Sequence, residues 1–139
     1  MKSKNFELFH EYQKRIVDEL LEEFSNNGVT FLKDAGENAN MYLAINGTKL
    51  LYTKWNGDIE VPQNLHYNQY NDIIGSWDCK YHRPKLDYSK FSGEVKAAFR
   101  KAMILYFDMV KRVKEQKIAG KIKELEKDFV DFEDDEDFE

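Results

Sequence analysis

The chain has 139 residues and a net charge of −5, and 42% of its residues are hydrophobic, 14% aromatic and 34% charged. This length suits one domain with one core, and the composition excludes a fully disordered chain. No apolar run approaches the roughly 18 residues of a membrane span, and the polar stretch MKSKNFELFHEYQ lacks a signal-peptide core. The single cysteine excludes a disulfide framework. We therefore expect a cytoplasmic protein without a membrane partner.

A helix is predicted at the start of the chain. Asn5 or Ser3 can cap it, and the stretch Asn26 to Gly28 is a stop signal, since glycine adopts the left-handed conformation that ends helices. Apolar residues recur between these signals at three- and four-residue steps and form one stripe: Phe6, Phe9, Ile16, Leu20 and Phe24.

A three- to four-stranded antiparallel meander follows the helix. The stretch MYLAINGTKLLYTKWNGDIEV contains two Asn-Gly pairs, and Asn-Gly favours the two-residue type I′ turn of a hairpin. Turns of that length pair Leu43 with Leu50 and Tyr52 with Val61. The second sheet face then collects Tyr42, Lys49, Leu51, Thr53, Trp55, Asp58 and Glu60. Residues 29–33 are expected to form a fourth strand, and Pro62 ends the meander.

Residues 62–91 have poor apolar periodicity, and the sequence suggests at most a short helix around Tyr70 to Ile74. A long helix is predicted from about Ser92 to about Lys127, with a bend or end allowed at Gly120. The expected fold class is therefore α+β: an N-terminal helix, the meander, a long C-terminal helix and a disordered acidic tail. We expect one domain over residues 1–132 and a tail over residues 133–139.

No catalytic motif is present, so a non-enzymatic protein without a cofactor is expected. The sequence contains neither of the phosphate-binding patterns G-x-G-x-x-G and G-x-x-x-x-G-K-[ST]. Ser76 also lacks the G-x-S-x-G context of a nucleophile elbow. Cys79 and His82 have the C-x-x-H spacing of half a zinc site, with His66 nearby, but a fourth ligand is not evident. An incidental grouping is the favoured interpretation of these three residues.

Two surfaces suit nucleic acid. Tyr42 and Trp55, with Lys49, would offer rings for stacking, unless residues 62–91 cover them as a second small core. The long helix is basic and would contact phosphates through Lys111, Arg112, Lys114, Lys117, Lys121 and Lys123. The alternative for this helix is an ordinary solvated surface, whose lysines pair with Glu115, Glu124 and Glu126.

Residues 128–139 carry eight acids and no base, so the rest of the chain is positive by about three charges. The expected partner-binding positions in this acidic run are Glu133, Asp134, Asp135, Glu136, Asp137 and Phe138. In composition the run resembles the partner-recruiting tails of single-stranded-DNA-binding proteins, although those end at the aromatic residue and this one continues to Glu139. We expect it to compete for the basic helix or to recruit a partner.

The leading hypothesis is a small binding protein that associates with nucleic acid or its processing machinery. One alternative is a DNA mimic, in which the carboxylates imitate a phosphate backbone and inhibit a nucleic-acid enzyme, as an anti-defence protein would. Another is a structural subunit of a viral or cellular assembly, which would form a homo-oligomer through the long helix.

Overall fold

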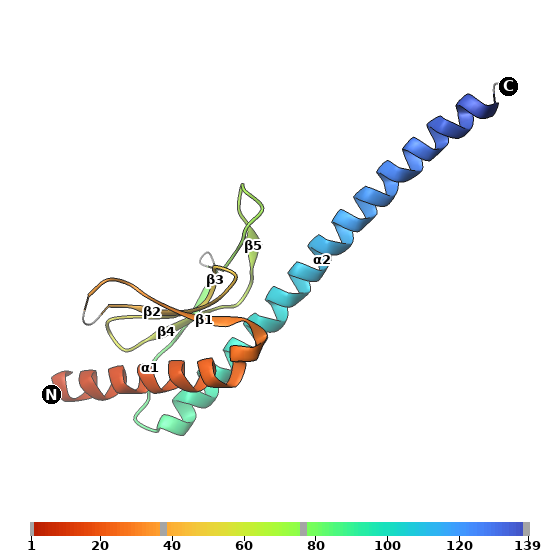
Figure 1. Ribbon diagram of the computed structural model, residues 1–139. Coiled ribbons are helices and arrows are strands. Elements are labelled where there is room, and N and C mark those ends of the chain that lie inside the picture. Colours follow the sequence, from red (N-terminus) through yellow and green to blue (C-terminus); the bar gives the residue numbers. More distant parts are fainter. Residues whose placement is uncertain (1, 37–38, 76–77, 138–139) are drawn as a thin grey trace. The chain divides into compact units, whose positions relative to one another are not determined.

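The computed structural model describes residues 2–36, 39–75 and 78–137, and the side chains of residues 2–4, 116–117 and 126–137 lie outside this description. The chain forms two compact units, residues 1–106 and residues 107–139. The first unit holds α1, the strands and the beginning of α2, and the second unit is the rest of α2 (Figure 1). The boundary expected after residue 132 stays a prediction.

The first helix, α1 (Lys2–Phe24), confirms the predicted amphipathic helix. A 3₁₀ turn, η1 (Ser25–Asn27), follows it, and Gly28 has φ of 86°. This left-handed conformation explains why glycine stands where the chain turns from η1 into the sheet.

Five antiparallel strands form the main sheet in the order β1-β2-β3-β4-β7. They are β1 (Val29–Lys33), β2 (Met41–Ile45), β3 (Thr48–Thr53), β4 (Ile59–Pro62) and β7 (Cys79–His82). The α+β class and the meander β1–β4 are confirmed, and β7 is an additional strand that the sequence did not predict.

The predicted register of β2 against β3 holds for the first two residue pairs, Ile45 with Thr48 and Ala44 with Lys49, and is wrong from Leu43 onwards. Ile45 faces Thr48 as expected, but the register shifts between Leu43 and Ala44, so that Leu43 faces Leu51. The shift is a bulge, which inserts one extra residue into β3. Leu50 and Leu51 are both fully buried, which strict alternation along a strand would not allow on a sheet with one covered face.

The predicted two-residue turn between β3 and β4 is also wrong. Thr53 faces Ile59 and Tyr52 faces Glu60, so five residues connect these strands. The Lys54 amide donates to the Asp58 carbonyl at 2.8 Å across this connection. The buried side chain of Gln13, in α1, donates to the carbonyls of the same two residues at 2.8 and 2.9 Å, so the helix holds the wider turn.

A small hairpin occupies the region of the short helix expected around Tyr70 to Ile74, so that prediction is wrong. Its strands are β5 (His66–Tyr67) and β6 (Ile73–Ile74). Asn68 accounts for the turn, because its side-chain oxygen accepts hydrogen bonds from the amides of Tyr70 and Asp72 at 2.8 and 2.9 Å. Side-chain acceptors of this kind favour turns over helix.

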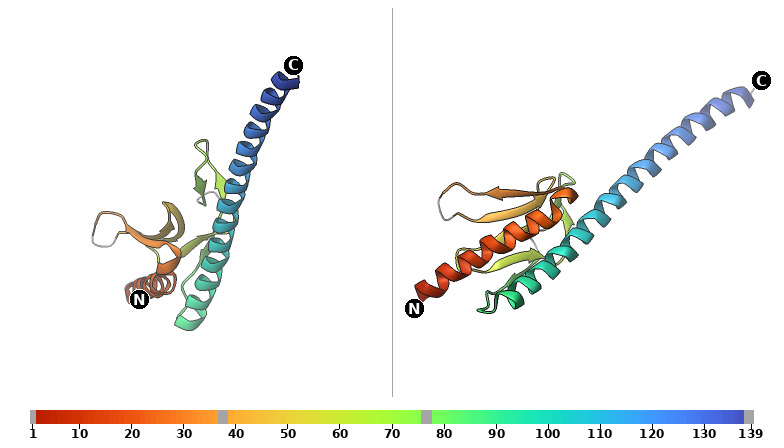
Figure 2. Two further views of the ribbon diagram at one scale, coloured as in Figure 1. Left: turned by 45° about the vertical axis from the view of Figure 1, so that its right-hand side comes forward. Right: turned by 60° about the horizontal axis from the view of Figure 1, so that its bottom comes forward.

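α1 and the first part of α2 pack on one face of the sheet, as the views in Figure 2 show. Two ion pairs join these helices: Lys96 with Glu19 at 3.0 Å and Arg100 with Glu23 at 3.1 Å. The fully buried side chains between helices and sheet include Ile16, Val17, Leu20, Leu43, Leu51, Ile59, Phe91, Val95 and Phe99.

The last helix, α2 (Tyr88–Asp137), is longer than predicted at both ends. Asp87 caps its start, since its carboxylate accepts a hydrogen bond from the Lys90 amide at 3.3 Å. The helix continues through Gly120. The disordered tail is not confirmed, because residues 133–137 belong to α2, whereas Phe138 and Glu139 lie outside the described residues. Within the described ranges, no helix is long and apolar enough to cross a membrane.

Candidate functional site

The sheet face opposite the helices carries one side chain from each of the five strands in a transverse line. Strand pairing places Leu32 beside Tyr42, Tyr42 beside Tyr52, Tyr52 beside Glu60, and Glu60 beside Tyr81. Directly paired residues point to the same side of a sheet. We call Leu32, Tyr42, Tyr52, Glu60 and Tyr81 the tyrosine row.

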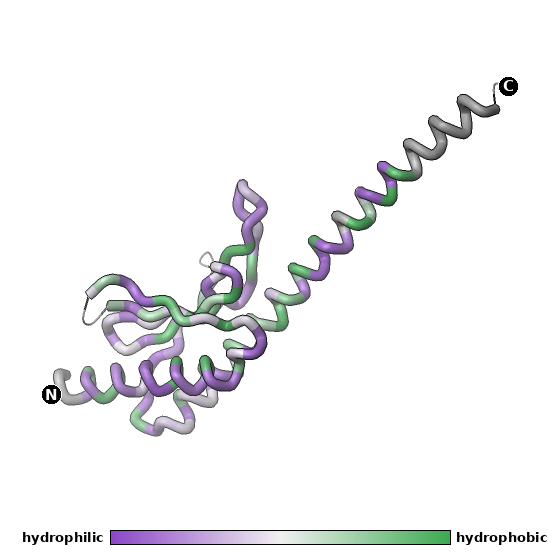
Figure 3. Tube along the Cα trace, in the orientation of Figure 1, coloured by the Kyte–Doolittle hydropathy of each residue, from purple (hydrophilic) through white to green (hydrophobic). Residues whose placement is uncertain are grey.

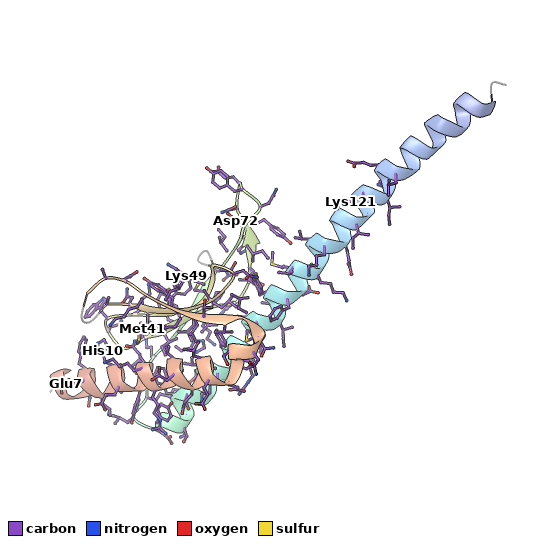
Figure 4. The ribbon with its side chains drawn as sticks, in the orientation of Figure 1. Glu7, His10, Met41, Lys49, Asp72 and Lys121 are labelled. Carbon is purple, nitrogen blue, oxygen red and sulfur yellow. The ribbon has the colours of Figure 1, made fainter. Side chains whose placement is uncertain are left out.

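Neighbouring side chains contact Tyr42 on several sides. The Lys49 ammonium lies 4.0 Å from its centroid, and the Tyr52 ring meets it edge-on at 5.8 Å. Its hydroxyl donates to the Asp34 carboxylate, and this hydrogen bond raises the pKa of Tyr42. The ring is therefore held in place by a cation, a second ring and a carboxylate, and Figure 4 labels Lys49 on the sheet.

The carboxylate of Glu60 is paired with a cation from the β3–β4 connection. Lys54 lies 3.0 Å from it, and its hydrogen bond with Tyr81 raises the pKa of the Tyr81 hydroxyl. Burial raises the pKa of Tyr52 to about 12. All three phenols are thus neutral at physiological pH, and each presents a π face and a hydroxyl rather than a charge.

The outer strands leave the ends of the tyrosine row open. Tyr81 is 57% exposed and Leu32 is 41% exposed, whereas Tyr42 and Tyr52 are half-buried. Residues 62–91 therefore contribute a strand and a tyrosine to this face, and the row that results is accessible at its edges.

Trp55 does not share the Tyr42 surface, contrary to the prediction that placed both on one face. It lies in the β3–β4 connection, where its ring is 6.2 Å from the Phe6 ring and its carbonyl oxygen is 2.8 Å from His10 Nε2 in α1. The longer connection explains the difference, because residues 54–58 leave the strand alternation. Trp55 is 71% exposed.

The predicted phosphate-binding residues lie in the second unit. Lys111, Arg112, Lys114, Lys121 and Lys123 are exposed on α2, and Lys117 has a side chain outside the description. Arg112 pairs with Asp108 at 2.8 Å. The four exposed lysines make no ion pair with any side chain that the structure describes.

The predicted partner-binding acids cannot be placed as side chains. Glu133, Asp134, Asp135, Glu136 and Asp137 have a helical backbone in α2, but their side chains lie outside the description. Phe138 lies outside the described residues altogether.

The half zinc site does not assemble around β7. Cys79 and His82 stand three positions apart in this strand, so they face opposite sides of the sheet. The Cys79 thiol instead donates to the Gly75 carbonyl at 3.0 Å. Among the described residues, no three His, Cys, Asp or Glu side chains are close enough to hold a metal ion.

A cavity of about 400 Å³ lies between the sheet and the first part of α2, and sequence reasoning missed it. Val61, Lys80, His82, Glu94, Ala97 and Lys101 are among the residues that line it. His82 is only 4% exposed, and neither ring nitrogen has a hydrogen-bond partner among the described residues. Its Nδ1 lies 3.9 Å from the Glu94 carboxylate, and burial lowers the pKa of His82.

Comparison with known proteins adds no family: no family model, curated protein or solved structure matches this chain.

Proposed function

We propose that the protein is a small, non-enzymatic, cytoplasmic binding protein that associates with single-stranded nucleic acid or its processing machinery. The observation that carries this proposal is the tyrosine row with the Lys49 ammonium against the Tyr42 ring. Aromatic rings on a pleated sheet stack unpaired bases, and each such contact contributes about 1–3 kcal/mol. Base stacking requires no sequence-specific donor, so the proposed binding is tolerant of sequence.

Charge around the row supports the same function. The two carboxylates that would repel phosphates, those of Asp34 and Glu60, are each engaged by a tyrosine hydroxyl, and Glu60 is also paired with Lys54. Lys49 is left to attract a phosphate. The exposed lysines of α2 supply a second, independent set of phosphate contacts, whose strength falls as salt rises.

The acidic residues 128–139 act as a regulator in this proposal. Because α2 is helical as far as Asp137, these acids reach the lysines of their own chain only when the end of the helix unwinds, and they then compete with phosphate for those lysines. Removing residues 128–139 therefore tightens binding to a single-stranded oligonucleotide.

The test is fluorescence anisotropy with a labelled single-stranded RNA or DNA at about 50 mM salt, where phosphate contacts are strong. Tyr42→Ala should weaken binding about tenfold, since one lost stacking contact is worth about 1–3 kcal/mol. Tyr70→Ala is the matched control, because Tyr70 is a 74% exposed tyrosine of the β5–β6 turn, outside the tyrosine row. Lys49→Ala should weaken binding and reduce its salt dependence.

Either of two results would contradict the proposal. One is no binding by either the full chain or the chain without residues 128–139. The other is equal affinities of the Tyr42→Ala and Tyr70→Ala variants. If the full chain instead forms a stable complex with a nucleic-acid enzyme, and neutralising the acids of residues 128–139 abolishes it, the DNA-mimic alternative is supported.

A further inference from the structure

The second unit carries an apolar stripe that is exposed to solvent. Ile118, Ile122 and Leu125 are 57%, 48% and 67% exposed, and they stand four and three positions apart on α2. This spacing is that of the seam in a two-stranded coiled coil. Figure 3 shows hydrophobic and hydrophilic residues alternating along this part of the helix.

The stripe defines a heptad. With Ile122 at position a, Ile118 and Leu125 take position d, and the same spacing continues in the sequence to Phe129 and Phe132. Gly120 then falls at position f, on the side away from the seam. A Cβ added there would meet no atom within 4 Å, as expected of an outward position. About two heptads are therefore ready to pair with another helix.

We propose that a second copy of this chain covers the stripe, with the two α2 helices antiparallel. The reason is charge complementarity. Residues 111–123 contain six bases and a single acid, whereas residues 128–139 contain eight acids and no base. An antiparallel pair centred between Ile122 and Leu125 sets the basic stretch of each copy beside the acidic stretch of the other.

The flanking heptad positions agree with this orientation. In an antiparallel pair, the two g rows meet on one side of the seam and the two e rows meet on the other. The g rows bring position 121 beside 128 and position 114 beside 135, which are Lys121 with Asp128 and Lys114 with Asp135. The e rows bring Arg112 beside Glu133. Every one of these pairs is attractive, and two-fold symmetry repeats each of them.

A parallel pair is disfavoured by the same positions. Parallel helices bring each g position beside the e position five residues further along the other chain. Asp128 would then lie beside Glu133, and the acidic stretches of the two copies would run side by side. Since charges at these positions set orientation, the antiparallel pair is selected.

In the dimer, the acidic residues of one copy form ion pairs with the lysines of the other copy. Lys114 and Lys121, which are exposed in the single chain, become the partners of carboxylates from the second copy. The dimer uses residues 112–135 and none of the tyrosine row, so it can hold or fail independently of base stacking, although nucleic acid bound to Lys114 and Lys121 would compete with it.

Sedimentation equilibrium of the full chain tests the dimer. We expect a reversible monomer–dimer equilibrium at micromolar concentration, weakened at least tenfold by Ile122→Asp, which places a charge in the seam. Gly120→Asp is the matched control, because it adds the same side chain on the outer side of the helix and should leave the equilibrium unchanged. A full chain that stays monomeric at high micromolar concentration, or equal effects of the two variants, overturns the proposal.

Cross-linking tests the orientation in a Cys79→Ser background. A Lys121→Cys chain mixed with an Asp128→Cys chain should give mainly mixed cross-linked dimers with a short bis-maleimide. A parallel pair would instead cross-link each variant to itself, and that result would reject the antiparallel arrangement. Charge reversal is a second measure: Lys114→Glu with Lys121→Glu should weaken the dimer, and adding Asp128→Lys with Asp135→Lys should restore it.

Discussion

The two parts of α2 have apolar residues at the same helical spacing and differ in what covers them. In residues 88–106, Phe91, Val95 and Phe99 are fully buried against α1 and the sheet. In residues 107–125, Ile118, Ile122 and Leu125 remain about half exposed or more. Periodicity therefore identifies the face of a helix that needs a partner, while the partner itself is found only by inspecting what lies against that face.

The largest expected loss of stability comes from a substitution in the buried part of α2, residues 88–106. Phe99→Ala should lower the free energy of unfolding by about 3–5 kcal/mol, because it removes a fully buried ring and leaves a cavity. Ile122→Ala, measured by urea denaturation at a concentration too low for self-association, should change it little. Equal losses in the two variants would show that the second stripe is also covered within a single chain.

The next effect concerns the polar contact that holds α1 to the sheet. Gln13→Met should lower the free energy of unfolding by about 1–3 kcal/mol, since the carbonyls of Lys54 and Asp58 lose a buried donor. The exposed Gln63 supplies the control, and Gln63→Met should have little effect. Similar denaturation midpoints for the two variants would mean that water replaces the amide.

A pH-dependent effect is expected from His82, whose pKa burial lowers from its ordinary value of 6.5. The unfolded chain then takes up this proton at a higher pH than the folded chain, so stability is lost as the pH falls below about 6.5. Glu94 opposes the shift, and the nearby ammonium groups of Lys80 and Lys85 favour it. Glu94 itself has a lowered pKa, so its own contribution is lost only below pH 4.5.

His82→Phe isolates this contribution. The variant should show a flatter dependence of Tm on pH between about 7 and 5 than the unaltered chain, because the buried imidazole is gone. Parallel Tm curves for the two proteins would assign the pH dependence to other groups.

The smallest expected change in the free energy of unfolding comes from a substitution in the exposed part of α2, residues 107–125. Arg112→Ala breaks an exposed pair with Asp108 and should lower the free energy of unfolding by at most about 0.5 kcal/mol. The same variant should weaken self-association, because Arg112 is expected to face Glu133 of the second copy. Asp108→Ala removes the same intrahelical pair and should leave self-association intact, so equal losses in the two variants would contradict the proposed e-row contact.

Local signals explain why much of the fold could be predicted. The apolar spacing of α1 and α2, the Asn-Gly turn at residues 46–47 and the stop at Gly28 all act over a few residues, and the structure agrees with each. The register of β3 depends on contacts from far along the chain. Gln13 fixes the connection before β4 from more than forty residues away, and no pattern within residues 48–62 indicates that contact.

The candidate site was harder to predict for the same reason. Tyr42 and Lys49 were identified because both lie in the readable hairpin, and they do lie together. Tyr81 joins them only because β7 pairs with β4, and the four residues of β7 are too short to show a period. The sequence does not indicate the position of Trp55, because a turn of five residues in place of two moves every residue of the connection relative to the sheet face.

Cys79 is a partly buried thiol whose reactivity reports on the local opening of the chain. Burial raises the pKa of this thiol to about 11, so at pH 7 only roughly one thiol in ten thousand is the reactive thiolate. The folded chain should therefore alkylate slowly and resist disulfide exchange. Any event that separates β7 from Gly75 returns the thiol towards ordinary reactivity. The rate at which Cys79 reacts thus measures how often this edge strand opens, in a chain that needs no added label.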